Sequence, residues 1–173
     1  MKNSLIAVSL GIALLAAAVP VAASEQANPE ALIGRVRAVL QTPRPPEHGI
    51  AKALGDALDA ALLVLPKAGY EAEFRSLVGG ARQAVEGGEM LSDGVYRDLL
   101  KSYRLVSGGK DWTVPAELKA AGEPGKGIEL AVKICNRLLD SALAACKAGR
   151  GEAAASDLIG LVLLVVTPIE AGR

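Results

Sequence analysis

Residues 157–169 have the sequence DLIGLVLLVVTPI, and this stretch decides the fold. From Leu158 to Val166 it is apolar on every side and rich in β-branched residues, so periodicity alone does not separate a buried helix from a buried strand. No other stretch has a strand pattern that could pair with it, and residues 152–155 favour the start of a helix. We therefore expect the central helix of a bundle. The stretch is too short to span a membrane, which takes about 20 apolar residues.

The other apolar residues of the chain follow helical spacing. Ala and Leu, which have the highest helix propensities, are abundant, and aromatic residues make up only 3% of the chain. We expect an all-α fold, a small helical bundle of about five to six helices with a four-helix-bundle-like core, in a single domain over residues 24–173. The helices are predicted over residues 29–40, 50–65, 70–85, 93–106, 127–147 and 157–169.

The connections between these helices carry clear signals. Asn28, which is followed by a proline, suits the cap of the first helix. Three prolines within residues 42–46 end that helix and predict a stiff connector. Residues 110–126, rich in Gly and Pro, are expected to form an irregular loop with one or two helical turns within residues 115–121. We expect Trp112 to pin this loop to the bundle.

The chain begins with the features of a secretory signal peptide, residues 1–23. Lys2 precedes an apolar run over residues 5–19, which is followed by a proline and small residues. This order is typical of a cleavable export signal, and we expect cleavage after Ala23. Cleavage slightly later in the chain and retention as a membrane anchor are the alternatives. The mature protein is expected to be periplasmic or secreted, with no membrane span after cleavage.

Charge and motifs argue against several classes of function. The chain has 19 basic and 19 acidic side chains, which are interspersed, so no basic patch predicts nucleic-acid binding. His48, expected just before the second helix, is the only histidine, whereas a metal site draws on several ligands. The sequence has no Cys-x-x-Cys-His motif for attached haem, no Gly-x-Ser-x-Gly elbow and no complete Walker motif. We expect no cofactor and no metal.

Two pairs of nearby carboxylates, Asp56 with Asp59 and Glu71 with Glu73, fall on helix faces predicted to be exposed. Paired carboxylates can serve general acid–base catalysis, but that role needs an environment that raises one of the two pKa values. The surrounding sequence predicts no such environment, and we interpret both pairs as solvated helix faces. A carboxylate-dependent enzyme is therefore an alternative without positive support.

Cys135 and Cys146 share the apolar face of the helix predicted over residues 127–147. On a continuous helix they lie about 16 Å apart, beyond the roughly 7 Å between Cα atoms that a disulfide allows. We expect two buried thiols. Because exported proteins meet an oxidising compartment, two alternatives are kept. One is an intermolecular disulfide in a two-fold dimer, from Cys135 of one copy to Cys146 of another. The other is an internal bridge made possible by a helix break at residues 140–141.

The leading interpretation of function is an exported, non-enzymatic module of the cell envelope that binds a protein partner or forms a homodimer. Its positive support is Trp112, which has Tyr96, Tyr103 and Lys110 nearby in sequence, because aromatic residues on a long connection often serve recognition. The alternative role of Trp112 is that of a loop anchor alone. A second hypothesis is a carrier of a small apolar ligand in a cavity between helices.

Overall fold

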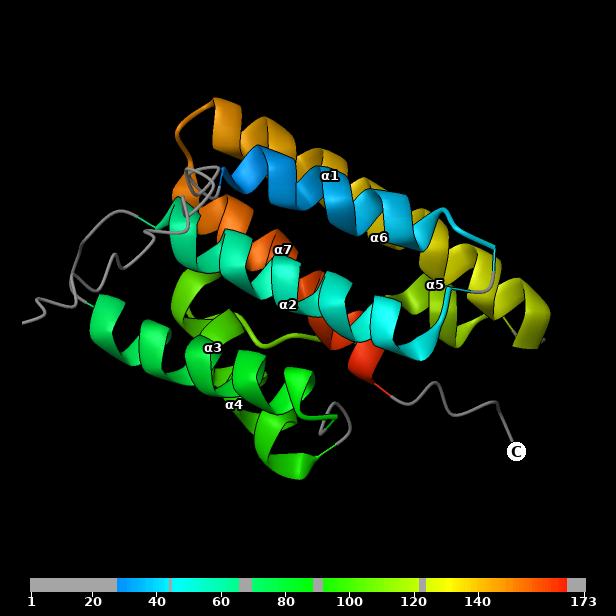
Figure 1. The fold of residues 1–173 in the computed structure, drawn as a ribbon, viewed down its shortest axis with the longest axis horizontal. Coiled ribbons are helices and arrows are strands. Elements are labelled where there is room, and N and C mark those ends of the chain that lie inside the picture. Colours follow the sequence, from blue (N-terminus) through cyan, green and yellow to red (C-terminus); the bar gives the residue numbers. More distant parts are fainter. Residues whose placement is uncertain (1–27, 44, 66–69, 89–91, 122–123, 168–173) are drawn as a thin grey trace, which may run out of the picture.

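In the computed structural model, the protein is built from α-helices and connections, without strands, over the residues that the structure describes, 28–43, 45–65, 70–88, 92–121 and 124–167. Its helices are α1 (Pro29–Leu40), α2 (Glu47–Val64), α3 (Glu71–Glu86), α4 (Asp93–Val106), α5 (Ala116–Lys119), α6 (Pro124–Lys147) and α7 (Gly151–Val166). The all-α prediction is confirmed, and the long helices form a bundle (Figure 1).

The central helix of this bundle is α7. It packs against α2, α4 and α6, and ten of its 16 residues are buried, including every residue from Leu158 to Leu164. A helix suits this position because it satisfies its own backbone hydrogen bonds, whereas a lone strand would bury unpaired N–H and C=O groups. The predicted helix is therefore confirmed as far as Val166, although it begins earlier than predicted, at Gly151. Residues 168–169 lie outside the described residues.

The other two long helices pack on the outside of these three. The first helix, α1, lies against α2 and α6, and α3 lies against α2 and α4. Ion pairs link these neighbours at the surface: Arg35 Nε on α1 is 3.0 Å from a carboxylate oxygen of Asp56 on α2. Arg82 on α3 similarly donates to Asp59 on α2. Because such partly exposed pairs contribute little, the apolar burial around α7 is the main source of stability.

Two helix starts follow the predicted capping signals. Asn28 Oδ1 accepts a hydrogen bond from the Glu30 amide at 2.9 Å, which confirms the cap of α1. Ser92 Oγ accepts from the Val95 amide at 3.3 Å at the start of α4. Both side chains thus satisfy an amide that the first helical turn would leave unpaired.

Two other helices begin earlier than predicted. The second helix starts at Glu47 rather than Ile50; extended Pro46 directly precedes it, and no side chain caps this end. The sixth starts at Pro124 rather than Gly127, since proline lacks the amide hydrogen that a first helical position leaves unpaired. The region 110–126 is therefore less irregular than expected. It contains the predicted short turn as α5 and also the first turn of α6.

The predicted signal peptide, residues 1–23, lies outside the described residues and stays a prediction. Among the helices that the structure does describe, none is both long enough and apolar enough to cross a bilayer.

We predict that Leu161→Ala lowers the free energy of unfolding by about 2–5 kcal/mol, because Leu161 is fully buried in α7 and its truncation leaves a cavity. Leu63→Ala is the matched control: Leu63 is 47% exposed on α2, and its truncation should cost less than about 1 kcal/mol. Urea unfolding followed by circular dichroism measures both values. Equal losses in the two variants would contradict the central position of α7.

Candidate functional site

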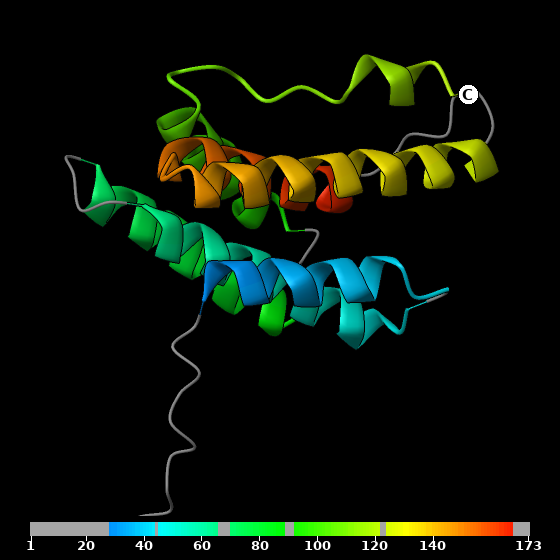
Figure 2. The same ribbon diagram turned by 90° about the horizontal axis from the view of Figure 1, so that it is seen from above.

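A tight turn at the C-terminal end of α4 sends the chain back across the bundle. Gly108 and Gly109 have φ angles of 70° and 82°, in the left-handed region that glycine adopts without strain. The Ser107 hydroxyl closes the turn by donating to the carbonyl of Lys110 at 2.9 Å. Residues 110–115 then run beside α6 and α7, on the side away from α1 and α2 (Figure 2). The double glycine therefore sets the path of the connecting segment.

The other end of this connecting segment is fixed by α5. Leu118 on α5 is buried in the core, and the neighbouring Glu117 accepts a hydrogen bond from Arg137 on α6 at 2.6 Å. The segment that carries Trp112 is thus held at both ends, by the turn after α4 and by α5.

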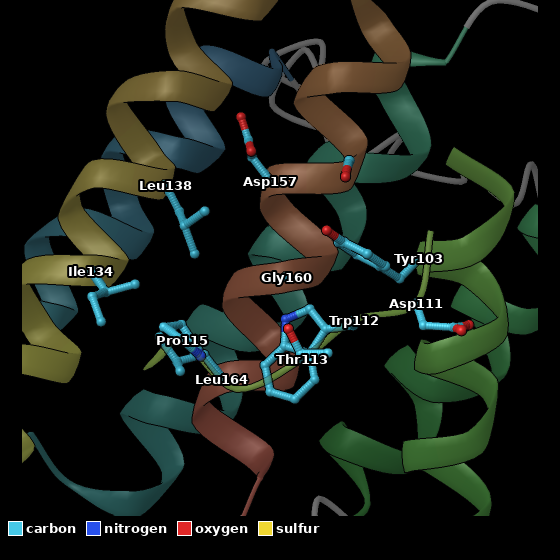
Figure 3. A pocket seen from close by; sticks show the side chains of 11 residues that line it. Tyr103, Asp111, Trp112, Thr113, Pro115, Ile134, Leu138, Asp157, Gly160 and Leu164 are labelled. Atoms are coloured by element: carbon cyan, nitrogen blue, oxygen red, sulfur yellow. The ribbon is translucent and has the colours of Figure 1, made fainter. Parts of the chain in front are cut away.

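Trp112 lies over Gly160, a buried glycine in the middle of α7. A Cβ atom at Gly160 would meet Tyr103 Cε2 at 3.5 Å and Trp112 Nε1 at 3.8 Å. Tyr103 from α4 and Trp112 from the connecting segment therefore converge on bare helix backbone (Figure 3). A methyl group at position 160 would therefore touch both rings at ordinary van der Waals distances.

These two rings form one side of an open groove against α6 and α7, with a volume of about 200 Å³. We call it the Trp112 groove and define it by Tyr103, Trp112, Leu138, Asp157 and Gly160. Further side chains extend its apolar walls, namely Pro115, Ile134 and Leu164. Polar side chains also line it, namely Asp111, Thr113, Ser156 and Asp157, so the lining is mixed. Apolar walls with polar groups beside them can hold a small ligand or a side chain of a partner.

Asp157 lies at the end of the groove nearest the start of α7 (Figure 3). Its side chain is half-buried, and burial raises the pKa of Asp157 above its ordinary value. A hydrogen bond with Ser141 and the positive charge of Arg150 offset part of that rise. Within the described part of the chain, Asp157 takes part in no direct ion pair. Its negative charge is therefore only partly compensated.

The structure brings two of the three predicted aromatic residues together. Trp112 and Tyr103 share the groove, whereas Tyr96 lies two turns earlier on α4, is half-buried against the core and does not line the groove. Trp112 also packs against the core, as expected of a loop anchor. Lys110 is exposed and does not line the groove. A role of Tyr96 in recognition stays a prediction.

Sequence reasoning missed Gly160 and Asp157 as parts of a site. The only sequence signal was the glycine that interrupts an otherwise continuous apolar run. An aspartate directly before that run is common near a helix start, so its sequence position gave no signal. In the structure, Asp157 is half-buried where α6 packs against α7.

Both cysteines are free thiols on an unbroken α6. The helix continues through residues 140–141, so the break required for an internal bridge does not occur. Cys135 is 3% exposed, and burial raises its pKa to about 11. Burial, together with the charge of Glu30, also raises the pKa of Cys146. The intermolecular disulfide stays a prediction, and it would require Cys135 to become accessible.

The other candidate groups are placed on the surface. Asp56 and Asp59 hold the ion pairs between α1, α2 and α3 described above, and Glu73 is exposed. His48 is exposed in the first turn of α2 and not before it, which corrects its predicted position. In the part of the chain that the structure describes, no three or more His, Cys, Asp or Glu residues gather as a possible metal site.

No protein-family model, curated protein or solved structure matches this chain significantly. The geometry of the Trp112 groove is therefore the feature that points to a function.

We predict that the thiol of Cys135 is nearly inert in the folded protein. With a pKa of about 11, only about one thiol in a thousand is ionised at pH 8, and this fraction rises about tenfold with each pH unit. In Cys146→Ser, Ellman's reagent should therefore react slowly at pH 8 and rapidly once guanidinium unfolds the chain. Rapid, complete reaction of the folded variant would contradict the burial of Cys135.

Reducing and non-reducing gels of the unmodified protein test the dimer crosslink. A monomer band in both lanes would exclude an intermolecular disulfide.

Proposed function

We propose that the protein is an exported, non-enzymatic binding module of the cell envelope, periplasmic or secreted, and that the Trp112 groove is its recognition site. The leader-like residues 1–23 support export. The observation that carries the recognition site is the placement of the Trp112 and Tyr103 rings over Gly160. Half-exposed rings that are packed against a rigid helix offer a large contact area with little loss of conformational entropy on binding.

The position of Gly160 supports a groove kept open for a ligand. Glycine inside a helix is about 1 kcal/mol less favourable than alanine, yet it occurs at the centre of the most buried helix. A Cβ atom at Gly160 would meet its neighbours only at ordinary contact distances, from 3.5 Å. Packing alone therefore does not require glycine here. A side chain at this position would instead fill space between α7 and the two rings.

The size of the groove bears on what it binds. A volume of about 200 Å³ suits a small molecule or one side chain of a partner protein, and is below the range of roughly 300–1,000 Å³ that is usual for drug-sized ligands. The groove is bordered by exposed Asp111 and Thr113, so it is open to solvent. An enclosed carrier of an apolar molecule therefore has less support than a recognition surface.

We predict that ligands found by NMR screening of fragments and short peptides shift the indole N–H of Trp112 and the amide of Gly160. Trp112 is the only tryptophan, so its indole signal reports on the groove without ambiguity. Trp112→Ala should weaken such ligands by about tenfold or more, since aromatic anchors often dominate binding energy. Leu63→Ala, on exposed α2 surface, is the control and should leave binding unchanged.

A second variant separates binding from folding. Gly160→Ala should keep or raise the thermal midpoint, because alanine favours the helix. It should nevertheless weaken ligands, because its methyl group enters the floor of the groove. The proposal is wrong if ligands bind elsewhere on the protein, or if neither Trp112→Ala nor Gly160→Ala changes their affinity.

A further inference from the structure

We propose that the Trp112 groove binds an alkylammonium group, with Asp157 as its anionic partner and the Tyr103 and Trp112 rings beside it. This inference rests on the proposed function, and it specifies the chemistry of the ligand. The ammonium group would come from a free amine or from a lysine side chain of a partner protein.

The first support is the arrangement of charge at the end of the groove. The Asp157 carboxylate is half-buried and lines the groove, and it forms no direct ion pair within the described residues. Burial disfavours the charged form, and the positive charge of Arg150 offsets this only in part, which agrees with the raised pKa of Asp157. A cationic ligand at the carboxylate would add to the compensation that Arg150 provides. An anion would be repelled by Asp157.

The second support is the chemistry of the walls. Faces of tyrosine and tryptophan rings attract ammonium groups through their quadrupole, and the Tyr103 hydroxyl and Ser156 hydroxyl are additional acceptors lining the groove. Ile134 and Leu164 continue the groove away from Asp157 with apolar surface, and Leu138 lies nearer Asp157 (Figure 3). The polar end and the apolar end therefore match the two parts of an alkylamine.

The third support is the geometry of α7. Asp157, Gly160 and Leu164 are three and four residues apart, so they lie on one face of the helix. From Asp157 to Leu164 the helix rises by about 10 Å. This face holds the carboxylate at one end, bare backbone in the middle and an apolar side chain at the other end. A straight alkyl chain with a terminal ammonium group can follow it.

The test titrates the full chain with n-hexylamine, n-hexanol and hexanoate at pH 7 and follows the Trp112 indole N–H by NMR. We expect the amine to bind about tenfold or more tightly than the alcohol, since a hydrogen bond to a charged group is the stronger one. Hexanoate should bind weakest. Asp157→Asn should remove the preference for the amine and leave n-hexanol binding unchanged. Asp98→Asn, on α4 outside the groove, is the control for a lost negative charge and should retain the preference.

The outcomes of this titration test the ammonium inference separately from the proposed binding function of the groove. If n-hexanol binds in the groove as tightly as n-hexylamine, the ammonium inference is wrong while the groove stands as a binding site. If none of the three probes moves the Trp112 signal, the ammonium inference is wrong, and the fragment and peptide screen decides the proposed function separately. Should Asp157→Asn fail to fold, the comparison of amine with alcohol in the unmodified protein still decides.

The same titration with Nα-acetyl-lysine methylamide distinguishes the two sources of the ammonium group. Binding at least as tight as that of n-hexylamine would assign the groove to a lysine side chain of a partner protein. Binding about tenfold weaker would assign it to a free amine.

Discussion

The burial of α7 is the constraint on which the rest of the structure depends. Its run from Leu158 to Leu164 has no exposed face, so other helices have to surround it. Three helices, α2, α4 and α6, lie directly against it, and α1 and α3 pack on the outside of these. The surface ion pairs add links between neighbours but cannot replace this burial, because exposed pairs are weak in water. The main packing role of the other helices is therefore to cover the apolar surface of α7.

The candidate site follows from the same constraint. The bundle leaves one side of α7 to be covered by the segment after α4 rather than by a long helix (Figure 2). Trp112 contributes to that cover, with its ring over Gly160. Because a connecting segment cannot fill space as completely as a packed helix, a groove remains beside the ring. The groove is thus where the covering of α7 is incomplete.

How far the sequence predicted these features depended on whether the signal was local. Asn28 and Ser92 correctly predicted the starts of α1 and α4, because a capping side chain acts within its own turn. The early starts of α2 and α6 were missed, because proline beside a helix start marks a break and a beginning equally well. The long apolar run was correctly placed at the centre, since no partner strand was available.

The groove itself could be predicted only in part, because its members come from distant parts of the chain. Trp112 and Tyr103 stood out as aromatic residues close together in sequence, and the fold brings both onto α7. Nothing local indicated that Tyr96, on the same helix as Tyr103, would lie outside the groove. The half-buried state of Asp157 depends on the packing of α6 against α7, which no sequence pattern specifies.

The central claim, that Trp112 lies on α7 at Gly160, is tested most directly by nuclear Overhauser effects in the isotopically labelled protein. The distances of 3.8 Å and 3.9 Å from the Cβ position of Gly160 to Trp112 Nε1 and Cδ1 predict strong cross-peaks between the Gly160 Hα protons and the indole protons. Cross-peaks from Gly160 to the Tyr103 ring should accompany them, given the 3.5 Å approach of Cε2. Absence of both sets, with Trp112 fluorescence like that of tryptophan in water, would contradict the account.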